Sequence, residues 1–233
     1  MSEVRPEVLL LVVGDGEFDV GRPTQDPIPN ADQPALPALP CLVHRLLDSQ
    51  PNIRFRTEML RNIRTNQTGG AGPKWGKKVK AAVLRARQSG AKGVAIVADR
   101  DGTGQERLRQ MEAARDALDS TAWVPCALGL AIETFDAWMI ADAHALREAG
   151  AIAAAPHPNP EGLDGREASG RHPKDYAATQ FGQQSGLGEK YADIAAALDI
   201  AALERACPRG FGAFAREVRQ HLQPVVASTG GSQ

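Results

Sequence analysis

Three aspartates directly follow two strongly apolar segments, and their type and spacing suit metal-assisted phosphate chemistry. Asp15 comes after the run 8–13, whereas Asp99 and Asp101 come after the run 93–98. Gathered carboxylates repel one another, so such a group needs a cation or protons to be stable. Mg²⁺, or Mn²⁺ in its place, takes a few carboxylate oxygens and leaves coordination positions for phosphate oxygens. We therefore predict a divalent-metal site that acts on a phosphate ester. The alternative is that each aspartate only caps a turn or a helix.

The two apolar segments are typical of strands that are buried on both faces. Further strands are predicted at 53–59 and 123–132. Helical spacing of apolar residues or helix-like composition predicts the intervening helices, at 42–47, 74–88, 105–118 and 135–148. This alternation predicts an α/β fold with a mostly parallel, Rossmann-like sheet flanked by helices. Ligands of such sheets bind beyond the carboxyl ends of the strands, which is where the three aspartates are expected.

The second part of the chain has a different character. Residues 156–170 are rich in proline, glycine and charge, and short helical segments follow at 190–198, 200–206 and 211–222. We predict an α/β domain over residues 1–150, a helical C-terminal extension over 151–225 that packs on it, and a flexible tail over 226–233.

Two glutamates are further candidates for the same crevice. Glu17 lies two residues after Asp15, and Glu133 follows the apolar run 127–132. With Asp15, they form the predicted set of catalytic residues. Acids that begin a helix are also favoured at the positive end of its dipole, which explains Glu133 without a catalytic role.

Lys74, Lys77 and Lys78 belong to the one dense basic cluster of the sequence, directly after the glycine-rich segment 68–73. Backbone N–H groups of such a loop, together with lysine charges, suit phosphate, so we predict phosphate binding by these three residues. The segment lacks the spacing of a Walker A loop, and a solvated helix face is the alternative.

Composition limits the partners. A formal net charge of −1 and a pI of about 6.5 leave no protein-wide field that would attract nucleic acid, so any such contact must be local. The three cysteines are far apart and lack the spacing of a zinc site. The run 8–13 is too short for a signal sequence or a membrane span. We therefore expect a cytoplasmic protein without membrane contact.

The order of the motifs resembles the TOPRIM domain, which carries an acid and a glycine after its first strand and Asp-x-Asp after a later one. Here the matching residues are Asp15-Gly16-x-x-Asp19 and Asp99-x-Asp101. The chain is more narrowly similar to small stand-alone bacterial TOPRIM-like proteins of uncharacterised function, relatives of the nuclease domains of overcoming-lysogenisation-defect proteins. The stretches 132–142 and 199–214 carry this narrower resemblance, which covers nearly the whole chain.

The resemblance implies a magnesium site in which the first acid, Asp15, acts as general acid or base while Asp99 and Asp101 bind the metal. It also implies nuclease or nucleotidyl-transfer activity on nucleic acid, and a partner protein such as an ATPase or another subunit of a phage-defence complex. TOPRIM domains usually have glutamate at the first position, one methylene longer than Asp15. Glu17 is the alternative holder of that role.

Two other functions compete with this one. Residues 96–103 match the haloacid-dehalogenase phosphatase signature, in which Asp99 would be the nucleophile and Asp101 the general acid or base. In those enzymes the nucleophile strand comes first, so a circular permutation would be required. A non-catalytic TOPRIM-like binding subunit is the other alternative, favoured by the near-neutral charge and the short Asp15.

Overall fold

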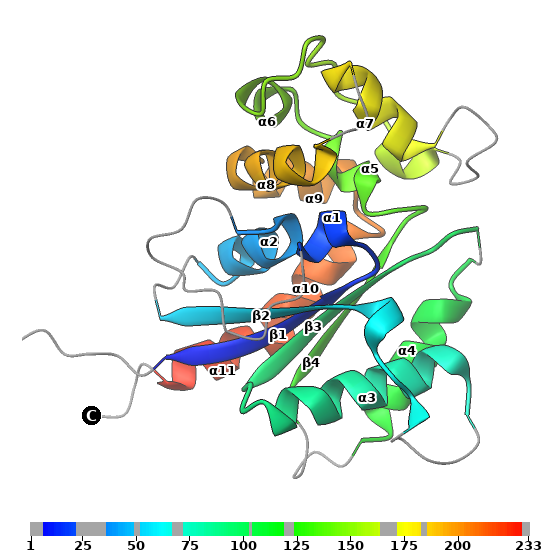
Figure 1. Cartoon of the computed structure of the whole chain (residues 1–233), viewed down its shortest axis with the longest axis vertical. Helices are drawn as coiled ribbons and strands as arrows, with labels where there is room; N and C mark the ends of the chain where they lie inside the picture. Colours follow the sequence, from blue (N-terminus) through cyan, green and yellow to red (C-terminus); the bar gives the residue numbers. More distant parts are fainter. Residues whose placement is uncertain are drawn as a thin grey trace, which may run out of the picture.

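The centre of the protein is a four-stranded parallel sheet with the strand order β2-β1-β3-β4 (Figure 1). The computed structural model describes residues 7–21, 36–48, 52–66, 72–102, 104–118, 124–163, 172–182 and 186–229. The strands are β1 (Val8–Gly14), β2 (Ile53–Met59), β3 (Gly93–Asp99) and β4 (Cys126–Ala131). The predicted α/β fold with a parallel sheet and helices on its faces is confirmed.

The two central strands are apolar at almost every position because helices cover both of their faces. In β1, Leu10 and Val12 belong to the hydrophobic core on one face, whereas Leu11 and Val13 belong to the core on the other. This division follows from the alternation of side chains along a strand. Strand β2 lies at the edge of the sheet and alternates buried residues with half-buried ones.

One face of the sheet is covered by α3 (Lys74–Gln88) and α4 (Glu106–Asp116), which lie together below the strands in Figure 1. Helix α3 buries Val79, Ala82, Val83 and Ala86 against this face at helical spacing. A 3-10 turn, η1 (Leu60–Asn62), follows β2 and packs its first residue into the same core.

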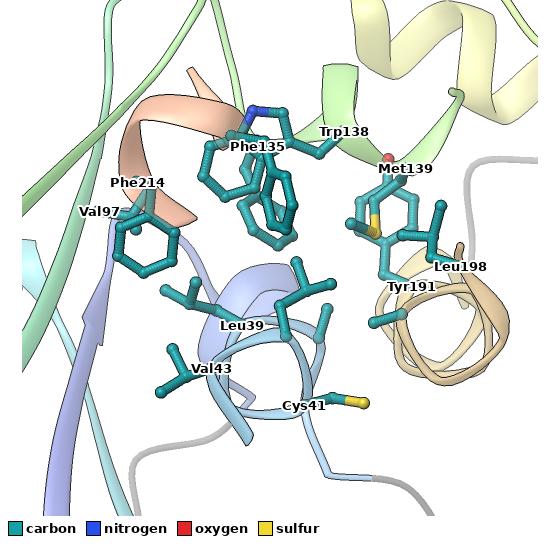
Figure 2. Packing of buried hydrophobic residues seen from close by; sticks show 14 of the residues in the cluster. Leu39, Cys41, Val43, Val97, Phe135, Trp138, Met139, Tyr191, Leu198 and Phe214 are labelled. Carbon is teal, nitrogen blue, oxygen red and sulfur yellow. The ribbon is translucent and has the colours of Figure 1, made fainter. Parts of the chain in front are cut away.

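The opposite face is covered by α2 (Ala38–Leu46) and α10 (Phe211–His221), and α8 (Leu187–Ala197) packs against α2. Phe214 of α10 stacks on Trp138 with ring centroids 5.9 Å apart, and both rings are buried beside Leu39 of α2 (Figure 2). Tyr191 of α8 joins the same cluster. The C-terminal helices thus share one hydrophobic core with the sheet.

The remaining helices are short. They are α1 (Glu17–Val20), α5 (Asp136–Met139), α6 (Ala143–Glu148), η3 (Pro160–Gly162), α7 (Pro173–Phe181), α9 (Ile200–Ala206) and α11 (Gln223–Thr229). The predicted helix 135–148 is two helices, because the Asp142 carboxylate caps α6 by accepting from the backbone N–H of His144 at 2.7 Å. Helix α11 includes residues 226–229, which were predicted as tail, and residues 230–233 lie outside the described residues.

Candidate functional site

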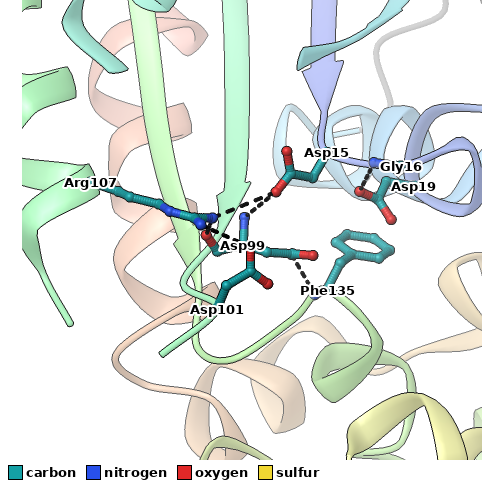
Figure 3. Close-up of polar contacts among 7 residues, drawn as sticks. All are labelled: Asp15, Gly16, Asp19, Asp99, Asp101, Arg107 and Phe135. Atoms are coloured by element: carbon teal, nitrogen blue, oxygen red, sulfur yellow. Dashed lines mark hydrogen bonds and ion pairs between the residues drawn. The ribbon is translucent and has the colours of Figure 1, made fainter. Parts of the chain in front are cut away.

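Asp15 and Asp99 meet at the carboxyl edge of the sheet. Strands β1 and β3 are neighbours and run parallel, so the residue that follows β1 lies beside the residue that ends β3. One carboxylate oxygen of Asp15, Oδ2, accepts a hydrogen bond of 3.1 Å from the backbone N–H of Asp99 (Figure 3). The two acids are therefore fixed to each other.

A pocket of about 440 Å³ opens at this edge, and we call it the acid pocket. Its lining combines the ends of β1 and β3 with residues from the start of α1 and α5, from η1 and from α7. The lining residues are Asp15, Gly16, Glu17, Asp19, Arg61, Asp99, Asp136 and Lys174. Acids outnumber basic residues, so the pocket attracts cations.

Asp19 reaches the pocket because helix α1 folds back tightly onto the end of β1. Its Oδ2 accepts from the backbone N–H of Gly16 at 3.0 Å. A side chain at Gly14 would place its Cβ 3.0 Å from the Cβ of Asp19 and 2.9 Å from Val20, so this close approach requires glycine. The turn after β1 thereby buries a second carboxylate beside Asp15.

The end of β4 and the C-terminal helices complete the pocket. Phe135 donates its backbone N–H to Oδ1 of Asp99 at 2.8 Å, which orients that carboxylate (Figure 3). The next residue, Asp136, accepts a hydrogen bond from the hydroxyl of the buried Tyr191 on α8. Residues far apart in the sequence thus hold the acids in place.

Burial and mutual repulsion favour the protonated forms of these acids. Burial is the largest cause of the raised pKa of Asp15, whereas the hydrogen bond from Asp99 lowers it. Burial raises the pKa of Asp19 to about 8, and the charges of Asp136 and Asp15 add to this effect. Burial also raises the pKa of Asp99 well above its usual range, and repulsion from Asp19 and Asp15 is the next largest cause. A cation in the pocket would oppose both causes.

Arg107 of α4 is the main counter-charge beside the pocket, on the side of Asp15 and Asp99 away from Asp19 (Figure 3). Its guanidinium contacts Oδ2 of Asp101 at 2.8 Å and Oδ2 of Asp15 at 3.9 Å, and it donates to the carbonyl of Asp99. The ring of Trp75 lies against the guanidinium, with 4.5 Å from Cζ to the ring centroid. Asp101 is turned toward Arg107 and does not line the acid pocket.

The structure therefore places two of the three predicted metal ligands, Asp15 and Asp99, in the lining of the acid pocket, whereas Asp101 lies beside them outside that lining. Sequence reasoning missed Arg107 and Arg61 as residues of the site. Arg107 stands in the first turn of the helix that follows Asp-x-Asp. From that position its side chain can contact the end of the preceding strand. An arginine in the first turn of the helix after Asp-x-Asp is therefore the sequence signal that could have identified it.

The two predicted glutamates lie in different places. Glu17 is exposed and lines the acid pocket. Glu133 is buried, forms an ion pair with Arg100 and does not line the pocket. Its carbonyl accepts from the backbone N–H of Asp101 at 3.1 Å, and both residues have left-handed backbones, with φ of 61° and 45°. Glu133 thus supports the turn after β3.

The three predicted phosphate-binding lysines lie on α3 beside the acid pocket, and none of them lines it. Lys78 donates to the carbonyls of Leu60 and Ile63, both at 2.6 Å, which fixes η1 against α3. Burial lowers the pKa of Lys78, and the charge of Lys74 contributes. Lys74 is exposed, and its charge lowers the pKa of Asp15. Residues 67–71 of the glycine-rich segment lie outside the described residues.

The donors of the acid pocket fit a hard divalent cation by their chemistry. Aspartate oxygens are the ligands that Mg²⁺ and Mn²⁺ prefer, and the raised pKa values of these acids reflect burial first and mutual repulsion second. Among the described residues, no group of three or more His, Cys, Asp or Glu side chains has the arrangement of a formed metal site.

Comparisons with models of protein families, with curated proteins and with solved structures found no match. The similarity to TOPRIM-like proteins stays a prediction from the motifs. None of the described helices has the length and apolar character needed to cross a membrane.

Proposed function

We propose that the protein is an enzyme that uses a divalent metal ion, Mg²⁺ or Mn²⁺, to hydrolyse phosphodiester bonds of nucleic acid. One observation carries the proposal: Asp15 and Asp99, from neighbouring parallel strand ends, share a pocket with Asp19 and Asp136. Buried carboxylates at this density are stable with protons or with a cation.

Asp15 and Asp99 would hold the ion, since both residues line the pocket and the Asp15 carboxylate accepts a hydrogen bond from the backbone N–H of Asp99. When bound, such an ion neutralises charge on a phosphoryl group or activates a water molecule. The resemblance to TOPRIM domains also gives Asp15 the role of general acid or base. Arg61 and Lys174, the basic residues of the pocket lining, would attract the anionic substrate.

The order of the motifs supports a phosphodiester rather than a phosphate monoester as substrate, because it is that of TOPRIM domains rather than that of haloacid-dehalogenase phosphatases. The pairing of Asp101 with Arg107 outside the acid pocket does not separate the two functions, because both assign that residue to the site. A partner protein such as an ATPase of a defence complex would supply additional nucleic-acid contacts, which the net charge of −1 makes useful.

The test is cleavage of end-labelled oligonucleotides by the full chain, with Mg²⁺ or Mn²⁺ and with EDTA as the control. We expect metal-dependent cleavage that Asp15→Asn lowers at least about a hundredfold. Asp15→Glu should also lower the rate, because a misplacement of about 1 Å costs about a hundredfold. The matched control is Asp193→Asn, which changes an exposed acid on α8.

Three outcomes would contradict the proposal. Equal, nonzero rates for wild type, Asp15→Asn and Asp15→Glu would remove Asp15 from the chemistry and move its role to Glu17. Release of phosphate from small monoesters, with beryllium fluoride trapped on Asp99, would show a phosphatase. Binding of nucleic acid without cleavage under any of these conditions would show a binding subunit.

A further inference from the structure

A second pocket lies directly beside the acid pocket, on the other side of η1. Arg61 lines the acid pocket, whereas the next residues of the chain, Asn62, Ile63 and Arg64, line a pocket of about 400 Å³. Helix α3 provides the opposite wall with Ala81, Arg85 and Gln88. We call this the η1 pocket, and the cyan turn after β2 marks its place beside α3 in Figure 1.

The lining of the η1 pocket suits an anion. It contains two arginines and the amides of Asn62 and Gln88, and it contains no carboxylate. Arg85 is partly neutralised by an ion pair with Glu58 of β2. Arg64 is exposed and pairs with no carboxylate of the described residues, so the pocket has a net positive charge. Guanidinium groups bind phosphate oxygens in a two-pronged geometry.

One side of helix α3 runs from beside the acid pocket to the η1 pocket. Lys74, Lys78, Ala81, Arg85 and Gln88 recur at spacings of four and three residues, which places them on one side of the helix. Lys74 acts electrostatically on Asp15, and Arg85 lies in the η1 pocket. At a rise of about 1.5 Å per residue, these two positions are about 16 Å apart along the helix axis.

The distance from Lys74 to Arg85 exceeds the length of a mononucleotide and fits an extended strand. The turn between the pockets is also held in place, because Lys78 bonds two of its carbonyls at 2.6 Å. We propose that the η1 pocket binds a phosphate group of a single nucleic-acid strand, several nucleotides away from the bond in the acid pocket. The inference rests on the proposed function, and it assigns Arg64 as a residue that positions the substrate.

The test is binding of fluorescently labelled single strands of about twelve and about three nucleotides, measured by anisotropy with Ca²⁺ over a range of salt concentrations. Arg64→Ala should weaken binding of the longer strand about tenfold, the loss expected for one charge-assisted hydrogen bond. The slope of log K against log salt should fall by about 0.7. Binding of the three-nucleotide strand should not change. Arg87→Ala is the matched control, because Arg87 is exposed on α3 and does not line the η1 pocket.

Equal affinities and salt slopes for Arg64→Ala and Arg87→Ala would overturn the inference, and so would an equal loss for both strand lengths or no binding by the wild type. A melting temperature of Arg64→Ala equal to that of the wild type would show that the variant is folded. Cleavage separates the two proposals. If Arg64→Ala weakens binding of the long strand but no metal supports cleavage, phosphate binding in the η1 pocket is supported and the proposed nuclease activity is refuted. If cleavage depends on Asp15 but Arg64→Ala binds the long strand normally, only the proposal for the η1 pocket is refuted.

Discussion

Replacing Asp19 by asparagine should change how the stability of the protein depends on pH. Burial raises the pKa of Asp19 from 3.8 to about 8 in the folded protein. Between about pH 4 and pH 8 the folded state keeps a proton that the unfolded state has lost, so the stability falls as the pH rises. One proton corresponds to about 1.4 kcal/mol per pH unit, or about 3 kcal/mol between about pH 5.5 and pH 7.5.

Asparagine resembles the protonated acid and retains an oxygen that can accept from Gly16. Asp19→Asn should therefore match the wild type near pH 4, and its advantage in stability should grow by about 3 kcal/mol between about pH 5.5 and pH 7.5. The assay is urea unfolding followed by circular dichroism at several pH values with EDTA present, and Asp193→Asn is the exposed control. Parallel pH profiles for the wild type and Asp19→Asn would refute this reasoning about the acid pocket.

Two further predictions concern packing and charge around the sheet. Arg107→Ala removes the partner of Asp101 and the counter-charge of Asp15, so it should lower the free energy of unfolding by about 1.5–3 kcal/mol in EDTA. Mg²⁺ should restore part of this loss. An unchanged melting temperature would count against this role of Arg107. Gly129→Ala would place a Cβ 2.8 Å from the ring of Phe214, so it should cost about 1–3 kcal/mol. Gly72→Ala should cost little, because its Cβ would meet only Cε of Lys77, at 3.9 Å.

The strand and helix limits that sequence reasoning predicted best are those with a clear hydrophobic period. Helix 74–88 and strand 53–59 have the predicted limits. Apolar residues recur at helical spacing in the first, and buried residues alternate with half-buried ones in the second, which is an edge strand. The break in segment 135–148 escaped prediction. It depends on Asp142, whose carboxylate both caps α6 and accepts from the backbone N–H of Asp199 at 3.0 Å. That second contact exists only in the folded chain.

The candidate site was predictable to the extent that it depends on strand ends. Asp15 and Asp99 follow apolar runs, and their meeting requires only that β1 and β3 are neighbours. The orientation of Asp101 could not be predicted, because it depends on the left-handed turn that ends β3 and on Arg107 from α4. The hydrogen bond from Tyr191 to Asp136 joins residues 55 positions apart, so no local sequence pattern predicts it.

The most direct test of the central claim is a crystal structure of the full chain soaked with MnCl₂, with anomalous data collected to locate manganese. The proposed function predicts an anomalous peak in the acid pocket, bound by carboxylate oxygens of Asp15 and Asp99, and its loss in crystals of Asp99→Asn. Crystals at saturating manganese that show both carboxylates clearly and no peak between them would contradict the proposal that this pocket is a metal centre.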